Sequence, residues 1–402
     1  MTIKKPSPDR QRGALRLISS WLTPLVALLA YLLFWPVPIE PVAWQAPQDL
    51  GHTGVHATNT RLAGLKALPL SAGQEGPEHI TSHLGVVYTG LSNGDVVRLS
   101  PEGQPQVVVN TGGRPLGLEA TADGTLYIAD AMKGLLAVNL AGGPAQLRTL
   151  VDKVDFPQSD DPIRYADAVA VDTRGHVWLS DASTRFDPKV HGGTFEASVL
   201  DIMEARCSGR LVVYDPVSER KRVALSGLCF PNGMVFSQDG QSLLVSETGR
   251  YRVLKIDLAR LSVTRSTQGM SSVPSLQNAM DQGAARVLID NLPGFPDNLT
   301  KGEGGRIWTG LTKPRGKVLD LASDLPWLRA MMLRLPRALW PVPPTYGHII
   351  AFDEQGQIVD DLQDPQGAYP ETTAATEVGG KLYVQSLHAR QVGWMPYAGP
   401  QR

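Results

Sequence analysis

Short apolar segments that follow glycine-containing turns recur along the whole chain. Six of them share one form, a turn, a β-prone triplet and then small or polar residues. Most are preceded and followed by a further apolar run that is bounded by Gly, Asp or Asn. Three or four short strands per unit, repeated six times, are typical of a β-propeller. The pattern therefore predicts an all-β, six-bladed β-propeller, with triplets centred on Tyr88, Tyr127, Trp178, Leu244, Trp308 and Tyr383.

Two inserts interrupt the repeats. Residues 185–207 are polar and fall inside the third unit. Residues 319–341 place Leu325, Leu328 and Met332 at helical spacing, with arginines between them and Pro336 as a break, so they predict a short amphipathic helical insert. Packing on the propeller is the favoured interpretation of that helix, and a lid or a patch that touches an anionic membrane is the alternative.

The N-terminal region has a different pattern. Residues 17–39 carry no charge, and residues 17–35 are numerous enough to cross a hydrocarbon core as a helix. Basic residues precede this run, and none follows it until Arg61, so the N-terminus is expected in the cytoplasm and the propeller on the periplasmic or extracytoplasmic side. A cleaved signal peptide is the less favoured alternative, because Trp44 occupies a position that should be small. We expect residues 1–45 to be a basic tail with a transmembrane anchor, and residues 46–402 to be the propeller.

Composition excludes several classes of function. The 402 residues include 38 Lys+Arg and 39 Asp+Glu, and this near-neutral balance argues against a nucleic-acid partner. The two cysteines, Cys207 and Cys229, are too few for a disulfide scaffold or a Cys-rich zinc site. They flank a predicted hairpin, where either a disulfide or two free thiols would fit.

Polar residues stand just before the inner apolar run of each unit, where a propeller opens its central channel. Carboxylates and side-chain amides that converge there would form an all-oxygen site, which suits Ca²⁺ better than Mg²⁺ or Mn²⁺ and does not suit zinc. Each such residue taken alone is more often a turn residue, and it is the recurrence at one point of successive units that favours a site. The sequence has no Gly-x-Ser-x-Gly elbow and no His-Glu-x-x-His motif, so chemistry would depend on the metal. The candidates are Glu78, Arg114, Asp167, Asn232, Asp297, Asn298 and Glu371.

The motifs Gly112-Gly-Arg-Pro-Leu-Gly117, Phe230-Pro-Asn-Gly233 and Pro293-Gly-Phe-Pro-Asp-Asn298 resemble the strictosidine synthase-like family of six-bladed propellers. More distantly, the chain is similar to paraoxonases and gluconolactonases. The resemblance implies one central Ca²⁺, with Asp297 also acting as base or nucleophile. The metal ligands that it implies are Glu78, Asp167, Asn232, Asp297 and Asn298.

Three positions depart from the related enzymes. Asp167 stands where the calcium hydrolases have Asn, which keeps an oxygen ligand. Thr373 stands where strictosidine synthase has its catalytic Glu, and Leu116 stands where paraoxonases have a His, so neither of those activities is expected. The expectation is a membrane-anchored, calcium-dependent hydrolase of small lactones or aryl esters. The alternative is a non-catalytic binding module with a structural metal ion.

Overall fold

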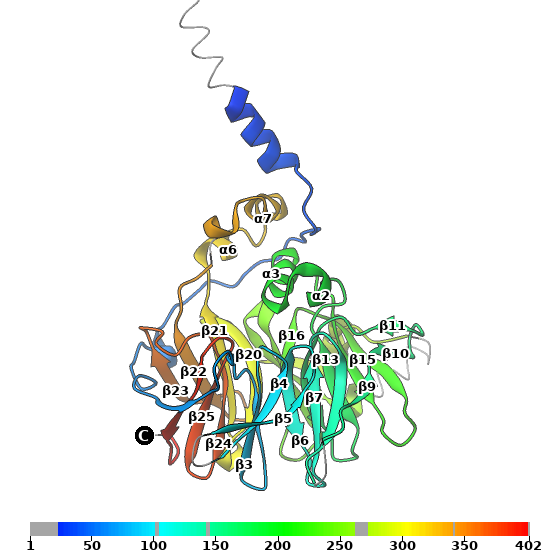
Figure 1. Cartoon of the computed structure of the whole chain (residues 1–402). Coiled ribbons are helices and arrows are strands. Elements are labelled where there is room, and N and C mark those ends of the chain that lie inside the picture. Colours follow the sequence, from blue (N-terminus) through cyan, green and yellow to red (C-terminus); the bar gives the residue numbers. More distant parts are fainter. Residues whose placement is uncertain (1–22, 101–103, 142–144, 262–271, 341, 401–402) are drawn as a thin grey trace, which may run out of the picture.

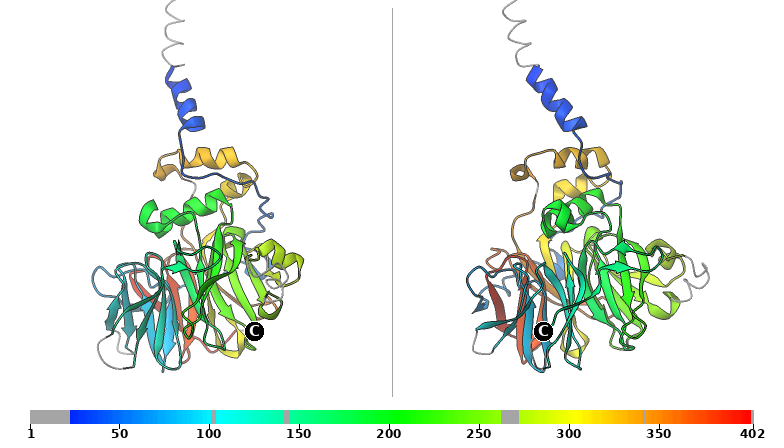
Figure 2. Two further views of the ribbon diagram at one scale, coloured as in Figure 1. Left: turned by 90° about the vertical axis from the view of Figure 1, so that its right-hand side faces the viewer. Right: turned by 45° about the vertical axis from the view of Figure 1, so that its right-hand side comes forward.

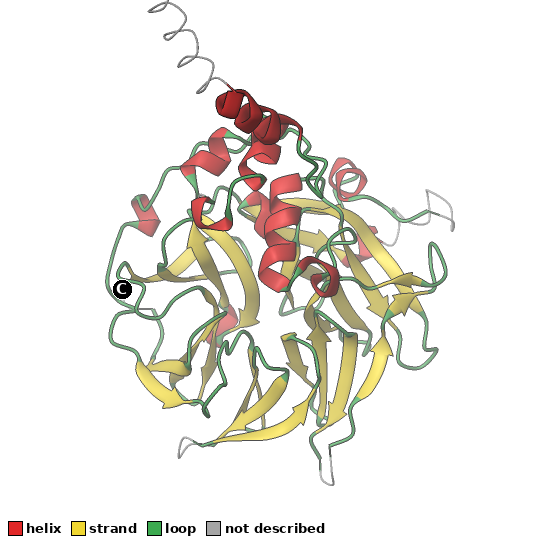
Figure 3. Cartoon of the chain, turned by 45° about the horizontal axis from the view of Figure 1, so that its top comes forward, coloured by secondary structure: helices red, strands yellow, loops and turns green. Residues whose placement is uncertain are grey.

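The computed structural model describes residues 23–100, 104–141, 145–261, 272–340 and 342–400. The described residues form six four-stranded antiparallel sheets that surround a central axis (Figure 1, Figure 3). The predicted six-bladed propeller is thereby confirmed. Each of the six predicted triplet centres lies on the second strand of a different blade, on β3, β7, β13, β17, β21 and β25.

Five blades follow the chain order from the inner to the outer strand. Their strands are β2 (Ile80–His83), β3 (Val86–Gly90), β4 (Asp95–Leu99) and β5 (Pro105–Asn110); β6 (Pro115–Ala120), β7 (Thr125–Asp130), β8 (Gly134–Asn139) and β9 (Arg148–Val151); β12 (Ala166–Val171), β13 (Val177–Asp181), β14 (Gly209–Tyr214) and β15 (Lys221–Leu228); β16 (Pro231–Phe236), β17 (Ser242–Glu247), β18 (Arg252–Asp257) and β19 (Ala285–Ile289); β20 (Gly294–Lys301), β21 (Ile307–Pro314), β22 (Gly347–Phe352) and β23 (Ile358–Asp364).

The sixth blade joins the two ends of the propeller. Its inner three strands are β24 (Thr372–Val378), β25 (Lys381–Ser386) and β26 (Gln391–Pro396), and its outer strand is β1 (Lys66–Pro69). β1 pairs antiparallel with β26, with Leu68 opposite Val392. An early strand therefore closes the ring against the last one, which removes an open sheet edge from the end of the chain.

The hydrophobic core lies between neighbouring blades. One cluster joins Trp178 and Leu211 of the third blade to Met234, Leu243 and Leu254 of the fourth. Strands within a blade are covered on both faces by adjacent sheets, so the inner strand β16 and the third strand β14 are buried along their whole length and do not alternate between apolar and polar residues. A further two-stranded ribbon is made of β10 (Lys153–Val154) and β11 (Asp161–Pro162).

Both predicted inserts are helical and lie at one end of the propeller (Figure 1, Figure 2). The first contains α2 (Pro188–His191) and α3 (Thr194–Glu204), and the second contains α7 (Pro326–Leu333), which follows α6 (Lys317–Leu321). Arg329 of α7 is fully buried and donates hydrogen bonds to the carbonyl oxygens of Met203, at 2.8 Å, and Ser323, at 3.2 Å. The second insert is thus packed on the first. The described residues also include α5 (Leu276–Asp281) and the short 3₁₀ turns η1 (Gly54–His56), η2 (Thr248–Arg250), η3 (Glu303–Gly305) and η4 (Arg337–Leu339).

The predicted membrane anchor is described only in part. Residues 23–34 form a helix, and the earlier part of the predicted span lies outside the described residues. No helix within the described ranges is long and apolar enough to cross a membrane. The expected transmembrane helix is therefore not supported by the described structure.

The two cysteines form a disulfide between Cys207, at the end of the first insert, and Cys229, just before β16. Of the two states that the sequence left open, the structure has the disulfide.

Candidate metal centre and cavity

The predicted site residues are carried by the innermost strands of four blades. Asp167 lies on β12, Asn232 on β16, and Asp297 with Asn298 on β20, while Glu78 stands two residues before β2. In β12, β16 and β20 the pairing register with the second strand shifts at these positions. A register shift of this kind bends the strand and re-aims side chains. This register shift explains why Asp and Asn residues, which are common in turns, lie within these strands and still face the channel.

Carboxylates at the ends of the second strands hold the loops that lead into these positions. Asp130 accepts from the backbone N–H of Arg114 at 3.1 Å, and Asp181 accepts from that of Tyr165 at 2.8 Å. Glu247 accepts from that of Cys229 at 2.7 Å. In these three blades the acid that ends the second strand therefore positions the entry to the inner strand of the same blade.

Neighbouring inner strands also approach closely near the axis. A Cβ added to Gly233 would lie 2.0 Å from the backbone nitrogen of Leu299, so only glycine fits there. Thr373 donates its hydroxyl hydrogen to the carbonyl oxygen of Glu78, and Ser246 donates to that of Asp297. These contacts fix the backbone of the site residues from the adjacent blades.

All five predicted metal ligands are buried, and each has a side-chain oxygen that accepts no hydrogen bond in the structure. A buried polar oxygen without a partner is unfavourable, and five at one place indicate a site built for a bound group. Asn298 shows how the amides are oriented, because its Nδ2 donates to Oε1 of Glu78 at 2.8 Å and leaves its own oxygen free. The unpaired atoms are Oε2 of Glu78 and Oδ1 of Asp167, Asn232, Asp297 and Asn298.

Three of these residues are carboxylic acids held close together away from water. Burial, followed by repulsion from Asp297 and Asp167, raises the pKa of Glu78 well above its usual value. Burial and repulsion from Asp297 raise the pKa of Asp167, and burial raises that of Asp297 to about 7. The charge of Arg114 opposes these shifts in Glu78 and Asp167. Three carboxylates against one guanidinium leave an excess of two negative charges, which fits one divalent cation.

A cavity of about 430 Å³ opens directly onto these residues. Leu116, Phe230 and Phe295 contribute apolar walls. Val199 and Met203 of α3, together with Met332 and Leu333 of α7, cover it from the side of the inserts. Apolar walls around a few convergent polar groups are typical of a site for a small organic molecule.

Glu371 is not among the unpaired oxygens. It forms an ion pair with Lys313 at 2.6 Å and a hydrogen bond with His388. Burial raises the pKa of Glu371, but the hydrogen bonds from His388 and Lys313 outweigh it and lower that pKa to about 2. Glu371 thus lines the cavity as a carboxylate that is already neutralised.

No pattern in the sequence indicated the residues that attach helix α3, which covers the cavity, to the channel. Tyr165, two residues before Asp167, lines the cavity and donates its hydroxyl hydrogen to the carbonyl oxygen of Thr194 at 2.9 Å. Thr194 is the first residue of α3. The sequence showed only that the first insert is polar, whereas in the structure α3 turns apolar side chains such as Val199 and Met203 toward the cavity.

Two segments match known family profiles. Residues 167–258 match strictosidine synthase, and residues 54–99 match the N-terminal region of strictosidine synthase-like proteins. The chain is 28% identical over 399 residues to the adipocyte plasma membrane-associated protein of Homo sapiens, an alignment that covers 93% of this chain and 87% of the human protein. It is 31% identical over 292 residues to strictosidine synthase-like protein 13 of Arabidopsis thaliana, which covers 71% of this chain and 62% of the plant protein.

Solved structures show the same fold at low identity. A gluconolactonase from Xanthomonas campestris superposes with a TM-score of 0.54 at 14% identity, over 90% of this chain and 98% of that structure. Regucalcin from Agrobacterium tumefaciens, described as a calcium-binding protein, has a TM-score of 0.50 at 16% identity, over 84% and 98% of the two chains. This chain therefore shares the propeller fold of these two structures. Its sequence is similar to the adipocyte plasma membrane-associated protein over most of its length, and to strictosidine synthase and strictosidine synthase-like proteins over the matched segments.

Proposed function

We propose that this protein is a calcium-dependent hydrolase of small lactones or aryl esters. The observation that carries the proposal is the set of five unpaired, buried oxygens from the residues predicted as ligands, four of which, Glu78, Asp167, Asn232 and Asp297, line a largely apolar cavity. Glu78, Asp167, Asn232, Asp297 and Asn298 would hold the ion. An all-oxygen set suits Ca²⁺, and one structural neighbour is described as calcium-binding. When bound, the ion would polarise the carbonyl oxygen of an ester.

The chain's own residues supply the rest of the chemistry. Phe230 and Phe295 offer apolar and aromatic surfaces that suit an aryl or alkyl group. Asp297 lines the same cavity, so its carboxylate is placed to accept a proton or to act as a nucleophile there. As base it would activate water, and as nucleophile it would attack the carbonyl carbon directly. Helices α3 and α7 would limit the access of bulk water.

The test is the turnover of a panel of aryl esters and lactones by the full-length protein, with and without Ca²⁺. We expect chelation to abolish turnover and Ca²⁺ to restore it. Asp297→Ala should abolish turnover while the circular dichroism spectrum is unchanged. Asp290→Ala, which removes an exposed acid outside the cavity, is the matched control and should leave the rate unchanged.

Absence of turnover in the calcium-loaded protein, or equal rates for wild type and Asp297→Ala, would contradict the hydrolase. If chelation then lowered the melting temperature with no activity to lose, the non-catalytic binding module with a structural ion would be the better description. Leu116, in the place of the paraoxonase His, is the residue that favours this second function.

We also propose that the N-terminal region anchors the propeller to a membrane lipid bilayer, with the propeller on the extracytoplasmic side. Leu25, Val26 and Phe34 of the 23–34 helix expose roughly half or more of their surfaces. The Cys207–Cys229 disulfide supports an oxidising compartment for the propeller. Protease treatment of sealed vesicles should leave the propeller accessible only from the extracytoplasmic face, and cleavage from the other face would contradict the orientation.

A further inference from the structure

A second group of metal-ligating side chains lies at the outer strand of the fifth blade. The segment that precedes β1 runs along β23 and is bound to it through both backbone and side chains. Leu62 N–H donates to the carbonyl oxygen of Gln363 at 3.0 Å, and Gln363 N–H donates to Oδ1 of Asn59 at 3.0 Å. The side chain of Gln363 donates to the carbonyl oxygen of His56 at 3.1 Å. This docking brings residues from the two ends of the sequence together.

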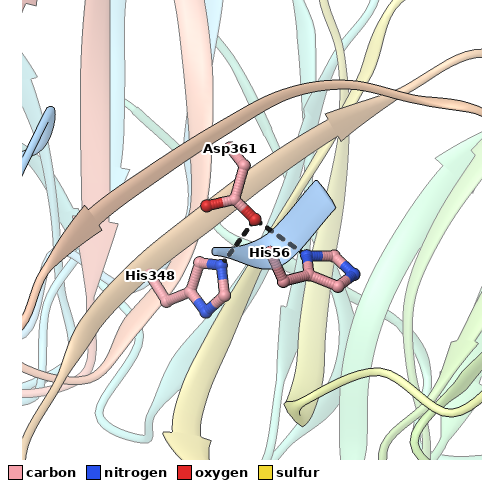
Figure 4. A group of neighbouring side chains, drawn as sticks. All are labelled: His56, His348 and Asp361. Atoms are coloured by element: carbon pink, nitrogen blue, oxygen red, sulfur yellow. Dashed lines mark hydrogen bonds and ion pairs between the residues drawn. The ribbon is translucent and has the colours of Figure 1, made fainter. Parts of the chain in front are cut away.

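Two imidazoles converge on one carboxylate oxygen there (Figure 4). Nδ1 of His56 lies 2.8 Å from Oδ2 of Asp361, and Nε2 of His348 lies 3.0 Å from the same oxygen. The three atoms lie within 4.8 Å of one another. Tetrahedral zinc with bonds of 2.0–2.1 Å places its ligand atoms about 3.3 Å apart, so shifts of a few tenths of an ångström would admit the ion.

The other oxygen of Asp361 is held in place by two amides. Nε2 of Gln363 donates to Oδ1 at 2.6 Å, and Nδ2 of Asn59 donates to it at 3.2 Å. Ligating carboxylates in metal sites are oriented by outer hydrogen bonds of this kind. His348 is 2% exposed, and burial lowers its pKa, which favours the neutral imidazole that metals bind.

A third imidazole adjoins the group. The ring of His52 stacks on Tyr346 at a centroid distance of 4.6 Å, and its centroid is 5.4 Å from that of His348. Its Nε2 is buried and has no hydrogen-bond partner in the structure. The group whose ligand atoms lie within 4.8 Å of one another consists of His56, His348 and Asp361, so His52 adjoins the group and is not counted among its ligands.

We propose that His56, His348 and Asp361 bind a transition-metal ion, Zn²⁺ in the first instance, which fastens the segment before β1 to the fifth blade. Nitrogen-rich coordination suits zinc and disfavours Ca²⁺. The central site has only oxygen ligands, so the two sites would select different ions. Because its ligands are His56 on one side and His348 with Asp361 on the other, the ion would cross-link segments that are distant in the sequence.

The test uses the full-length protein, stripped with a chelator and titrated with Zn²⁺ against a chromophoric competitor. We expect one equivalent of zinc, and substitution by Co²⁺ should give the visible absorption of a tetrahedral site. His56→Ala removes a ligand at the edge of the blade and should weaken zinc binding by about 100-fold or more. Should His56→Ala perturb folding, His56→Gln gives the same test with a side chain that still donates to Asp361.

His176→Ala is the matched control, because His176 also pairs with a carboxylate, Asp172, at 3.1 Å, in the third blade. It should bind zinc like the wild type. Asp297→Ala should also retain zinc, so that failure of the proposed hydrolase is distinguished from failure of this site. Zinc should slow cleavage by trypsin after Arg61 in the wild type and not in His56→Ala. No stoichiometric zinc in the wild type, or equal affinity in His56→Ala, would overturn the proposal.

Discussion

At the scale of single residues, charge decides what the channel can hold. Glu78, Asp167 and Asp297 face one another, and Arg114 supplies the opposing charge within their reach. Asp167 is the position where related calcium hydrolases have Asn. Its extra negative charge raises the pKa of Glu78 through repulsion, and a divalent ion would relieve that repulsion. The charge of Asp167 therefore couples the binding of a divalent ion in the channel to the protonation of Glu78.

We predict that Asp167→Asn keeps an oxygen ligand but weakens Ca²⁺ binding by about 10-fold, because the loss of one charge costs on the order of 1.4 kcal/mol of attraction. Isothermal titration calorimetry with Ca²⁺ measures the effect. Asp167→Ala should bind still more weakly, because it also removes the oxygen. Wild-type affinity in both variants would show that Asp167 does not contact the ion.

Residue types at repeated positions indicated seven candidates for the channel, and the family resemblance selected five of them as metal ligands. Asp167, Asn232 and Asp297 lie on the inner strands of successive units, so the repeat itself aligned them. His56 and His348 belong to no repeat, and they meet only because the segment before β1 returns along β23. No local spacing in the sequence encodes that meeting. The pattern of hydrophobic positions likewise predicted the blades but could not show where the inserts would pack.

At the scale of elements, helix α3, which covers the cavity, is held to the propeller by buried polar groups. Asp201 of α3 is 4% exposed and accepts hydrogen bonds from Ser183 at 2.6 Å and Ser208 at 3.1 Å. Burial raises the pKa of Asp201 to about 7 in spite of these bonds. In the folded protein the group is thus protonated below neutral pH, whereas in the unfolded chain it ionises near pH 4.

This difference makes the stability of the protein depend on pH. The folded state binds the proton more tightly, so the contribution of Asp201 is fully present below about pH 4 and is lost as pH rises through about 7. We predict that Asp201→Asn removes this loss of stability at rising pH. The free energy of unfolding of the variant relative to wild type should increase by on the order of 2–4 kcal/mol between pH 4 and pH 8.

Denaturant unfolding at a series of pH values measures the difference, with saturating Ca²⁺ to hold the channel carboxylates in one state. Asp281→Asn, at an exposed position of α5, is the control and should follow the wild-type curve. Parallel curves for wild type and Asp201→Asn would show that the group titrates alike in the folded and unfolded states.

At the scale of the whole molecule, the propeller is a closed ring whose last blade is completed by β1. Leu68 and Leu70 also pack against the cluster of Ile80, Val87 and Val392, which joins the sixth blade to the first. The segment before β1 contributes further, since Arg61 pairs with Asp360 at 2.5 Å at the fifth blade. The N-terminal region therefore has two parts. The segment before β1 and β1 itself stabilise the closed ring, whereas the helix of residues 23–34 is not part of any blade.

We predict that a chain that starts at residue 37 folds with nearly the melting temperature of the full chain. It loses the hydrogen bonds from Arg334 to the carbonyl oxygens of Leu32, at 2.9 Å, and Trp35, at 2.5 Å, which are partly exposed. It keeps the buried Ile39 and the whole of β1. A chain that starts at residue 70 lacks β1 and exposes the edge of β26, so its melting temperature should fall by ~10 °C or more, or the cooperative transition should disappear.

Calorimetry on both truncated chains makes the comparison, and the chain that starts at residue 37 is the matched control for loss of the N-terminal helix. Addition of a peptide that contains residues 60–70 should restore part of the lost stability, because the exposed edge of β26 offers the same backbone groups to a strand supplied in trans. Equal melting temperatures for the two chains would mean that interblade packing alone holds the ring closed. In that case β1 would serve to cover an edge and not to complete the fold.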